Sequence, residues 1–277
     1  MAGGRADLTV VVCTLGRATV SEAVDSIAAS ARAVARNVQL VVVWQAAEEP
    51  PPLGGGVEVL RVRPRGLSHA RNEGLAVATA PLVGFVDDDE VVDERWVNEA
   101  LRAFTTDGTL DGAFGPVLIA APEAPAYFSS GAEPRIFEGR HRPPWAIGTG
   151  GNMVFSRETL VRAGGFDTRF GAGAPGAAAE ETDLFLRLLG DRGRLLYTPR
   201  MCVYHPPRSP RDELVARRAY GFGMGAVLRR SPVLAAKYLY TIVQELVRAA
   251  QRRDGSRRRR TFATLRGFCG GLLSRPR

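Results

Sequence analysis

The sequence predicts an α/β protein in which helices flank a mostly parallel sheet, followed by a helical extension. In the first half of the 277 residues, β-rich apolar runs alternate with amphipathic segments of helical period. This is the pattern of parallel strands joined by crossover helices. From about residue 209 onward the pattern is helical only. We therefore expect one domain over residues 1–208 and a helical extension over residues 209–277.

Four strands and two helices are expected before residue 87. The run 8–13 is continuously apolar and β-rich, and the same pattern returns at 38–44, 57–62 and 82–86. The first helix, 19–34, places apolar side chains at helical spacing, namely Val20, Val24, Ile27 and Ala31. The second, 67–79, carries Arg71 and Asn72 near its beginning. Residues 48–56 are too rich in Pro and Gly for a regular element and form a surface loop.

An acidic triplet, Asp87-Asp88-Asp89, directly follows the fourth strand. Three adjacent carboxylates repel one another, so a chain that holds them at the end of a buried strand usually has a cation to offset the charge. The helix start with Arg71 and Asn72 suits an anion such as a pyrophosphate. The alternatives are an acidic surface turn or a calcium site for the triplet, and a simple ion pair with Glu73 for Arg71.

Further elements follow the triplet. A helix is expected over 93–104, with Asp93 as its N-cap, and a strand over 113–119. The stretch 121–147 contains five prolines and reads as a long irregular segment, which its aromatic residues mark as ordered. In the C-terminal part we expect helices over 211–229, 232–250 and 261–273. One apolar face of the second could lie on a membrane or pack on the first domain, through Val233, Leu234, Tyr238, Ile242, Leu246 and Val247.

The composition is that of a soluble globular protein, and the charge is unevenly distributed along the chain. The content of 45% hydrophobic and 24% charged residues is ordinary for a soluble globular protein. The net charge of +8 is concentrated near the end of the chain, at Arg252, Arg253 and 257–260. This basic tail favours anionic surfaces, either phospholipid headgroups or nucleic acid; a solvated segment without a partner is the alternative.

The cysteines and the apolar runs indicate the compartment. Cys13, Cys202 and Cys269 are odd in number, widely spaced and without the spacing of a metal site, which favours a reducing cytoplasm. No secretory leader pattern is visible, and no apolar run approaches about 18 residues. We expect a cytoplasmic protein that does not span a membrane, with a peripheral contact on the inner face of the membrane as an option.

Six motifs follow one another along the chain: LTVVVCTLGR (8–17), GLSHARNEG (66–74), VGFVDDDE (83–90), GTGGNMVF (148–155), AGGFD (163–167) and EETDLFLR (180–187). Their order resembles that of family 2 glycosyltransferases of the GT-A fold, which has a Rossmann-like, mostly parallel central sheet. Several motifs in one order are far more specific than any of them alone. The resemblance implies an inverting, metal-dependent enzyme that moves a sugar from a nucleoside diphosphate sugar to a glycan, lipid-linked or small-molecule acceptor.

The resemblance also implies a metal site. Expelling a diphosphate needs a divalent ion to neutralise the charge on the leaving oxygens, and Mn²⁺ or Mg²⁺ binds hard oxygen ligands. By similarity Asp89 is the direct ligand, whereas Asp87 and Asp88 contact the ribose or metal-bound water. His205 stands where relatives have a histidine that can complete the coordination, although a lone histidine is more often structural.

A general base must also activate the acceptor hydroxyl. By the resemblance, Glu181 is the first choice for this base and Glu180 is the second. Acidic residues at a helix start are also common for capping alone. The glycine-rich stretch 148–152 lets backbone approach a sugar closely, and Asn152 could bind a sugar hydroxyl or the diphosphate; a strand-start turn is the alternative. The irregular stretch 121–147 is expected to form part of the acceptor site.

The ends of the first two strands depart from the family pattern. Many relatives end the second strand with an Asp that reads the nucleotide base, whereas this chain has Gln45 near that place. Thr14 and Arg17 keep the expected types, but 15–16 replaces an aromatic-Asn pair. Gln45, Thr14 and Arg17 are therefore expected to contact the donor, without fixing which base it carries.

Two other function classes compete with a glycosyltransferase. A sugar nucleotidyltransferase is disfavoured because the first strand leads into 13–17 without a glycine-rich triphosphate loop and its Lys. A protein that uses its basic tail to bind nucleic acid or another anionic surface leaves the triplet unexplained. No aromatic residues are interleaved with the arginines, so no nucleic acid is expected as a partner. The oligomeric state and the sugar stay open.

Overall fold

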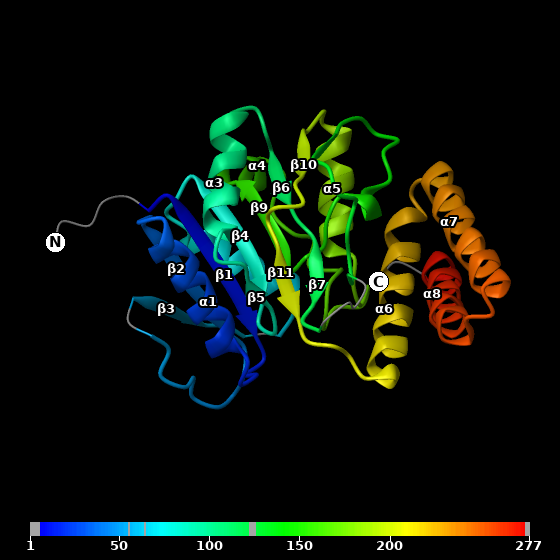
Figure 1. The fold of residues 1–277 in the computed structure, drawn as a ribbon, viewed down its shortest axis with the longest axis horizontal. Coiled ribbons are helices and arrows are strands. Elements are labelled where there is room, and N and C mark those ends of the chain that lie inside the picture. Colours follow the sequence, from blue (N-terminus) through cyan, green and yellow to red (C-terminus); the bar gives the residue numbers. More distant parts are fainter. Residues whose placement is uncertain (1–5, 55, 64, 122–125, 275–277) are drawn as a thin grey trace. The chain divides into compact units, whose positions relative to one another are not determined.

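The chain divides into two compact units (Figure 1). The computed structural model describes residues 6–54, 56–63, 65–121 and 126–274. The first unit comprises Met1–Arg65, His69–Phe166 and Leu184–Pro207, and the second comprises Gly66–Ser68, Asp167–Asp183 and Arg208–Arg277. The first unit contains the sheets, whereas the second contains the three C-terminal helices.

An eight-stranded sheet forms the centre of the first unit, in the order β3-β2-β1-β4-β9-β6-β10-β8. Its strands are β1 (Leu8–Thr14), β2 (Val38–Trp44), β3 (Val57–Arg61), β4 (Leu82–Asp87), β6 (Gly112–Phe114), β8 (Arg135–Phe137), β9 (Asn152–Ser156) and β10 (Leu195–Tyr197). Only β8 and β9 run opposite to the other six. The mostly parallel α/β sheet predicted from the sequence is confirmed.

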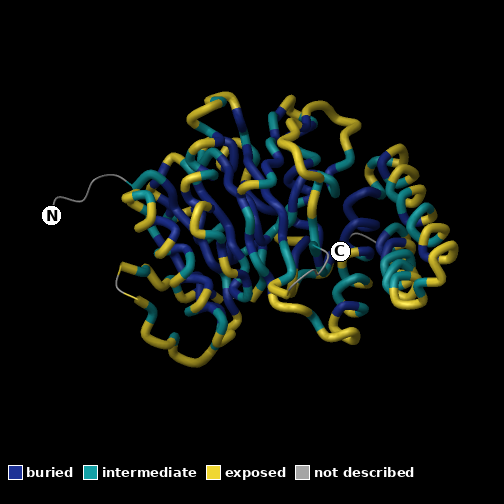
Figure 2. Tube along the Cα trace, viewed as in Figure 1, coloured by how far each residue is buried: buried dark blue, intermediate teal, exposed yellow. Residues whose placement is uncertain are grey.

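Helices cover both faces of this sheet, which explains why its strands are continuously apolar. Alternate residues of β1 point to opposite faces, so Val10 and Val12 belong to one buried cluster and Val11 to the other. The first cluster includes side chains of α1 (Val20–Ala33) and α3 (Trp96–Thr106). The second includes side chains of α2 (Leu67–Val77), α4 (Arg157–Arg162) and α5 (Glu180–Gly190). The central strands are correspondingly buried in Figure 2, whereas the edge strands β3 and β8 are mostly not.

The strand expected over 113–119 is wrong as a single element. The chain bends at Gly115-Pro116 and forms two strands, β6 and β7 (Val117–Ile119), which belong to different sheets. Pro116 has no N–H for a ladder, and a side chain at position 115 would overlap the backbone carbonyl of Met201. The strand β7 joins a small sheet with β5 (Val91–Val92) and β11 (Val203–His205), in the order β5-β11-β7.

Two further expectations need correction. The described part of 121–147 is not wholly irregular, because it contains β8 and a short 3-10 helix, η1 (Pro144–Ala146). Asp93 does not cap a helix that starts beside it, since α3 begins at Trp96. Instead Asp93 forms the preceding turn: its carboxylate accepts from Arg95 N at 3.0 Å and its carbonyl accepts from Trp96 N at 2.9 Å.

The second unit contains α6 (Pro210–Leu228), α7 (Pro232–Gln251) and α8 (Gly255–Leu273). The last helix begins six residues before the expected start at 261, so most of the predicted basic tail lies in its first two turns. Asp254 explains this start, because its side chain accepts from Arg257 N at 2.8 Å as an N-cap. Within the described ranges, no helix is both long and apolar enough to cross a membrane.

Candidate active site

The ends of β1 and β4 meet at one edge of the sheet. These strands are parallel neighbours with Cys13 opposite Asp87, and the strand order reverses beside them. Such a reversal is where open α/β sheets bind ligands. Thr14 joins the two strand ends: its hydroxyl donates to Asp88 Oδ2 at 2.6 Å and accepts from the backbone N–H groups of Gly16 and Arg17 at 3.0 and 3.2 Å.

Arg17 reaches from the loop after β1 to the acidic triplet. Its Nη1 lies 3.3 Å from Asp88 Oδ1 and also pairs with Asp89 Oδ2. The Arg17 side chain is more than half exposed, whereas Asp88 is buried. Arg17 therefore presents a solvent-accessible cation at the mouth of the carboxylate cluster.

Arg71 neutralises the triplet from the buried side. Its Nη2 lies 3.1 Å from Asp87 Oδ1 and donates to the Gly150 carbonyl at 2.9 Å. Its guanidinium carbon lies 5.9 and 5.5 Å from the ring centroids of Phe85 and Phe166. The expected alternative, a pair with Glu73, is wrong, because Arg71 points into the core. A fully buried guanidinium in this position orients Asp87 and the glycine-rich stretch.

His205 is brought to Asp89 by the small sheet. In the antiparallel pairing of β5 and β11, Tyr204 lies opposite Val91, which sets His205 beside the residues that follow β4. The His205 Nε2 lies 3.6 Å from Asp89 Oδ1. The His205 Nδ1 lies 2.5 Å from the Pro206 carbonyl, so a proton on Nδ1 would leave the Nε2 lone pair directed to Asp89. Two predicted metal ligands therefore converge.

The charge balance of this cluster fits a cation. Burial raises the pKa of Asp88 to about 6, against the hydrogen bond from Thr14 and the charge of Arg17. Burial and the charges of Asp87 and Asp89 raise the pKa of Glu90 well above its usual value. The buried Glu90 Oε2 has no hydrogen-bond partner among the described residues. An additional cation at the carboxylates would lower both pKa values.

The protein offers few ligands for that cation. Across the ranges that the structure describes, no three His, Cys, Asp or Glu side chains converge as a complete site. Mg²⁺ and Mn²⁺ commonly take one or two protein ligands and fill their shell with phosphate oxygens and water. The pair Asp89 and His205 fits that kind of site better than a calcium cage.

Two predicted donor residues are engaged within the protein. Asn152, the first residue of β9, is fully buried and donates to the carbonyls of Pro116 and Met201 at 3.0 and 2.6 Å. Its oxygen accepts from Trp96 Nε1 at 2.8 Å. Asn72 Nδ2 donates to the Phe166 carbonyl, and Asn72 Oδ1 accepts from Phe166 N, both at 2.8 Å. The Asn152 amide therefore ties loops to the sheet, and the Asn72 amide ties the loop at Phe166 to α2.

Gln45 lies where β2 ends, next to the end of β1. It is buried, and its backbone N–H donates to the Thr14 carbonyl at 3.0 Å. The same sheet edge therefore holds Gln45, Thr14 and the triplet.

The acidic pair Glu180-Glu181 belongs to the second unit and opens α5. Glu180 is buried, and its carboxylate lies against the backbone of Gly171, where an added Cβ would be 3.3 Å from Oε2. Glu181 is half-buried, and its Oε1 accepts from the Thr182 hydroxyl at 3.2 Å. The positive end of the helix dipole stabilises carboxylates here.

Glu90 was not predicted as a site residue, and Tyr127 was expected only as part of the acceptor-binding stretch 121–147. A Cβ on Gly151 would come within 2.6 Å of both Glu90 carboxylate oxygens, so glycine at 151 lets Glu90 occupy its buried position. The Tyr127 ring packs edge-on against the His205 ring with centroids 4.9 Å apart. Glu90 is the fourth residue of the acidic run 87–90, which was a visible signal, whereas no local pattern placed Tyr127 beside His205.

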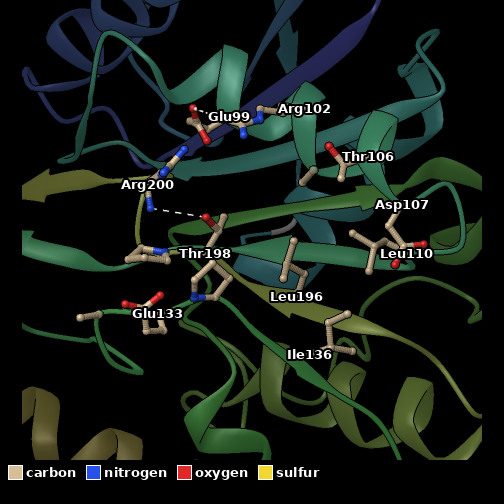
Figure 3. A pocket seen from close by; sticks show the side chains of 14 residues that line it. Glu99, Arg102, Thr106, Asp107, Leu110, Glu133, Ile136, Leu196, Thr198 and Arg200 are labelled. Atoms are coloured by element: carbon tan, nitrogen blue, oxygen red, sulfur yellow. Dashed lines mark hydrogen bonds and ion pairs between the residues drawn. The ribbon is translucent and has the colours of Figure 1, made fainter.

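A groove of about 750 Å³ lies elsewhere on the first unit, between α3, β8 and β10 (Figure 3). Its floor includes Leu110, Ile136 and Leu196, and its rim carries charges of both signs such as Glu99 and Arg200. None of the predicted site residues lines it, so the groove is separate from the carboxylate cluster.

Comparisons with known proteins agree with the motif order. The chain is 26% identical over 151 residues to a glucosyl-dolichyl phosphate glucuronosyltransferase of Haloferax volcanii, covering 51% of this chain and 48% of that protein. It is 28% identical over 170 residues to a pre-mycofactocin glycosyltransferase of Mycobacterium tuberculosis, covering 59% and 35%. It is 27% identical over 235 residues to the succinoglycan biosynthesis protein ExoM of Rhizobium meliloti, covering 78% and 72%. The chain thus spans half or less of the first two relatives.

The solved structure of S. aureus TarS residues 1–349 matches with a TM-score of 0.54 at 16% identity, covering 79% of this chain and 65% of that one. Its complex with UDP matches with a TM-score of 0.55 at 15% identity. This likeness confirms the expected GT-A fold. The model of "Glycosyl transferase family 2" matches residues 9–160, more than half of the chain. The chain therefore belongs to glycosyl transferase family 2.

Proposed function

We propose that this protein is an inverting glycosyltransferase that moves a sugar from a nucleoside diphosphate sugar to a hydroxyl of an acceptor. The observation that carries the proposal is the convergence of Asp89 and His205 at the sheet edge, with Nε2 and Oδ1 3.6 Å apart. Family membership supports the reaction class. The carboxylate cluster at these strand ends has a cation on two sides, Arg17 from the loop after β1 and Arg71 from α2, which suits a diphosphate.

Asp89 and His205 would hold a divalent metal, Mn²⁺ or Mg²⁺. When bound, such an ion would neutralise the charge that develops on the diphosphate leaving group. Arg17, more than half exposed at the cluster, is suited to bind a donor phosphate. We further assign Asp87 and Asp88 to the ribose or to water on the ion, with Arg71 and Thr14 holding these two carboxylates in place. Buried cations and hydroxyls fix such groups before substrate arrives.

Three further residues are assigned to the donor, Gln45, Asn72 and Asn152. Gln45 is placed at the edge where a nucleotide base could be read. Asn72 and Asn152 keep their assignment only from the family resemblance, since their amides already bind backbone groups. Their contribution to donor binding would then be indirect, through the loops that they hold.

Glu181 is our first choice for the general base, and Glu180 is the second. In an inverting transfer, the base takes the proton of the acceptor hydroxyl while the sugar–phosphate bond breaks, in one displacement. Glu181 is the more exposed of the two carboxylates, so an acceptor reaches it more readily. Residues 1–208 would form the transferase domain, and residues 209–277 a helical extension.

The acceptor is a glycan, a lipid-linked sugar or a small molecule. The relatives' names refer to glucosyl-dolichyl phosphate, to pre-mycofactocin and to the biosynthesis of succinoglycan. These names differ, so we assign the choice of acceptor to contacts outside the carboxylate cluster. A lipid-linked acceptor would bring a cytoplasmic enzyme to the inner face of the membrane.

A thermal-shift panel tests the donor site. UDP, GDP, TDP and CMP sugars are each added with and without Mn²⁺, and we expect one nucleotide to raise the Tm only with the metal. Asp89→Asn should lose this shift, whereas Asp25→Asn, the same change on the exposed side of α1, should keep it. If no nucleotide stabilised the protein in a metal-dependent way, the proposed chemistry would fail.

The base is tested separately. Glu181→Gln should retain metal-dependent nucleotide binding and lose turnover, because the amide cannot accept the proton. Glu180→Gln is the matched control on the neighbouring residue. Full turnover in Glu181→Gln with loss in Glu180→Gln would exchange the two roles.

A further inference from the structure

The outward face of α7 is apolar. Val233, Tyr240, Val243 and Val247 are between 46% and 64% exposed. Their spacing of seven, three and four residues places them on one side of a helix, and the exposed Ala236 lies in the same row. In Figure 2 the tube along α7 is mostly yellow and teal, because few of its residues are buried. We call these five residues the outer stripe.

The opposite face of α7 is used within the second unit. Leu234, Ile242 and Ala249 are buried, and the Tyr238 ring packs against Phe268 of α8 with centroids 5.1 Å apart. The single apolar face expected from the sequence is therefore wrong, because Val233 and Val247 lie on the outer stripe and not with Leu234. A surface helix with one buried face normally turns polar residues to water. The outer stripe breaks that rule along about four turns.

The segment of the chain that carries the outer stripe is strongly basic. Residues 229–274 contain eleven Arg and Lys residues, and their acidic residues are only Glu245 and Asp254. Glu245 pairs with Arg248 and Arg257 at 2.8 and 2.5 Å, and Asp254 caps α8. The two negative charges are thus engaged by the helices themselves, and nine positive charges are left in excess.

We propose that the outer stripe docks on a bilayer surface that contains anionic phospholipids. Valine side chains would enter the boundary between headgroups and acyl chains, and Tyr240 suits that interface because its ring is apolar and its hydroxyl polar. The Arg and Lys residues would bind lipid phosphates while their stems cover apolar surface.

Other occupants fit the same surface less well. A second copy of this chain would bring two strongly positive segments together, which like charges oppose. A nucleic acid would use the arginines but would not need an apolar row. The anionic bilayer is the occupant that uses both the apolar stripe and the positive charge.

Vesicle flotation with the full chain tests the proposal. We expect binding to phosphatidylcholine vesicles that contain phosphatidylglycerol, and weaker binding to phosphatidylcholine alone. Val243→Glu with Val247→Glu should weaken the binding about tenfold or more, since each valine would lose its apolar contact. The matched control is Val161→Glu with Val215→Glu, because these valines are 58% and 63% exposed and lie on α4 and α6.

The control makes the same change in net charge, so it separates apolar docking from charge alone. Equal weakening in both double variants would overturn the proposal, as would no vesicle binding by the unmodified protein. Size-exclusion chromatography identifies the alternative: a dimer that only the α7 variant converts to a monomer, without vesicle binding, would assign the stripe to a second copy. Donor hydrolysis in solution should be unchanged in both variants, so failure of the transferase chemistry would show independently.

Discussion

Replacing Arg71 by methionine should destabilise the first unit far more than removal of an exposed arginine. Methionine keeps an unbranched apolar stem against Phe85 and Phe166 but removes the charge and two hydrogen bonds. Asp87 would then stand beside three other carboxylates without its nearest cation. The Gly150 carbonyl would also lose its partner.

The size of the effect follows from burial. Removing one partner of a buried ion pair costs about 3–5 kcal/mol. The Arg71 side chain is buried but that of Asp87 is 39% exposed, so solvent screening favours the lower end, about 3 kcal/mol. For a folding unit of about 150–250 residues, each 1 kcal/mol lowers the Tm by about 2–4 °C. We therefore expect a Tm lower by about 6–12 °C.

Thermal and urea unfolding followed by circular dichroism measure this loss. The control is Arg61→Met, which breaks an exposed pair with Glu49 of 2.6 Å and should cost less than about 1 kcal/mol. Arg71→Lys should fall between the two, because an ammonium cannot span Asp87 and the Gly150 carbonyl while stacking on both rings. If Arg71→Met lowered the Tm and the urea midpoint no more than Arg61→Met, the buried cation would not be needed to hold the triplet.

Two further predictions concern the helices of the second unit. Gly267→Ala should destabilise it, because a Cβ would meet the Arg218 carbonyl on α6, whereas Gly270→Ala should be tolerated, since its nearest neighbour is a side-chain atom at 3.6 Å; similar urea midpoints would contradict this close packing. Burial raises the pKa of Tyr238 from 10.0 to about 12, so stability should fall as the pH rises from about 10 to 12, where only the unfolded state ionises. Tyr238→Phe should remove that part of the loss of stability. If the urea midpoints of the unmodified protein and of Tyr238→Phe declined equally between pH 9 and 11.5, the raised pKa of Tyr238 would be refuted.

The sequence predicted most of the sheet because its strands are continuously apolar. The first four strands differ from β1 to β4 by one residue at most at either end. The errors lie where a local pattern is ambiguous. The residues on both sides of Gly115-Pro116 are apolar, so the pattern suggested one strand where the chain forms two. The arginines before 261 suggested a basic tail, although they belong to the first two turns of α8, which Asp254 caps.

Part of the candidate site could also be predicted from the strand pattern. Polar residues that follow β1 and β4 had to meet once those strands were parallel neighbours, so Thr14, Arg17 and the triplet converge as expected. The amides of Asn72 and Asn152 were expected at a ligand, but they hold backbone groups. An exposed and a buried polar side chain look identical in a linear motif, since burial depends on what packs above it.

The sequence by itself determined the first four strands and the two helices between them, the acidic triplet at the end of a buried strand and the positive charge of the last helices. These follow from side-chain period and residue type, which act over a few neighbours in the chain. Only the tertiary structure decided that His205 reaches Asp89, that Arg71 is buried beneath the triplet and that α7 has two apolar faces. Those outcomes depend on strand register and helix packing between residues far apart in sequence, which no local pattern encodes.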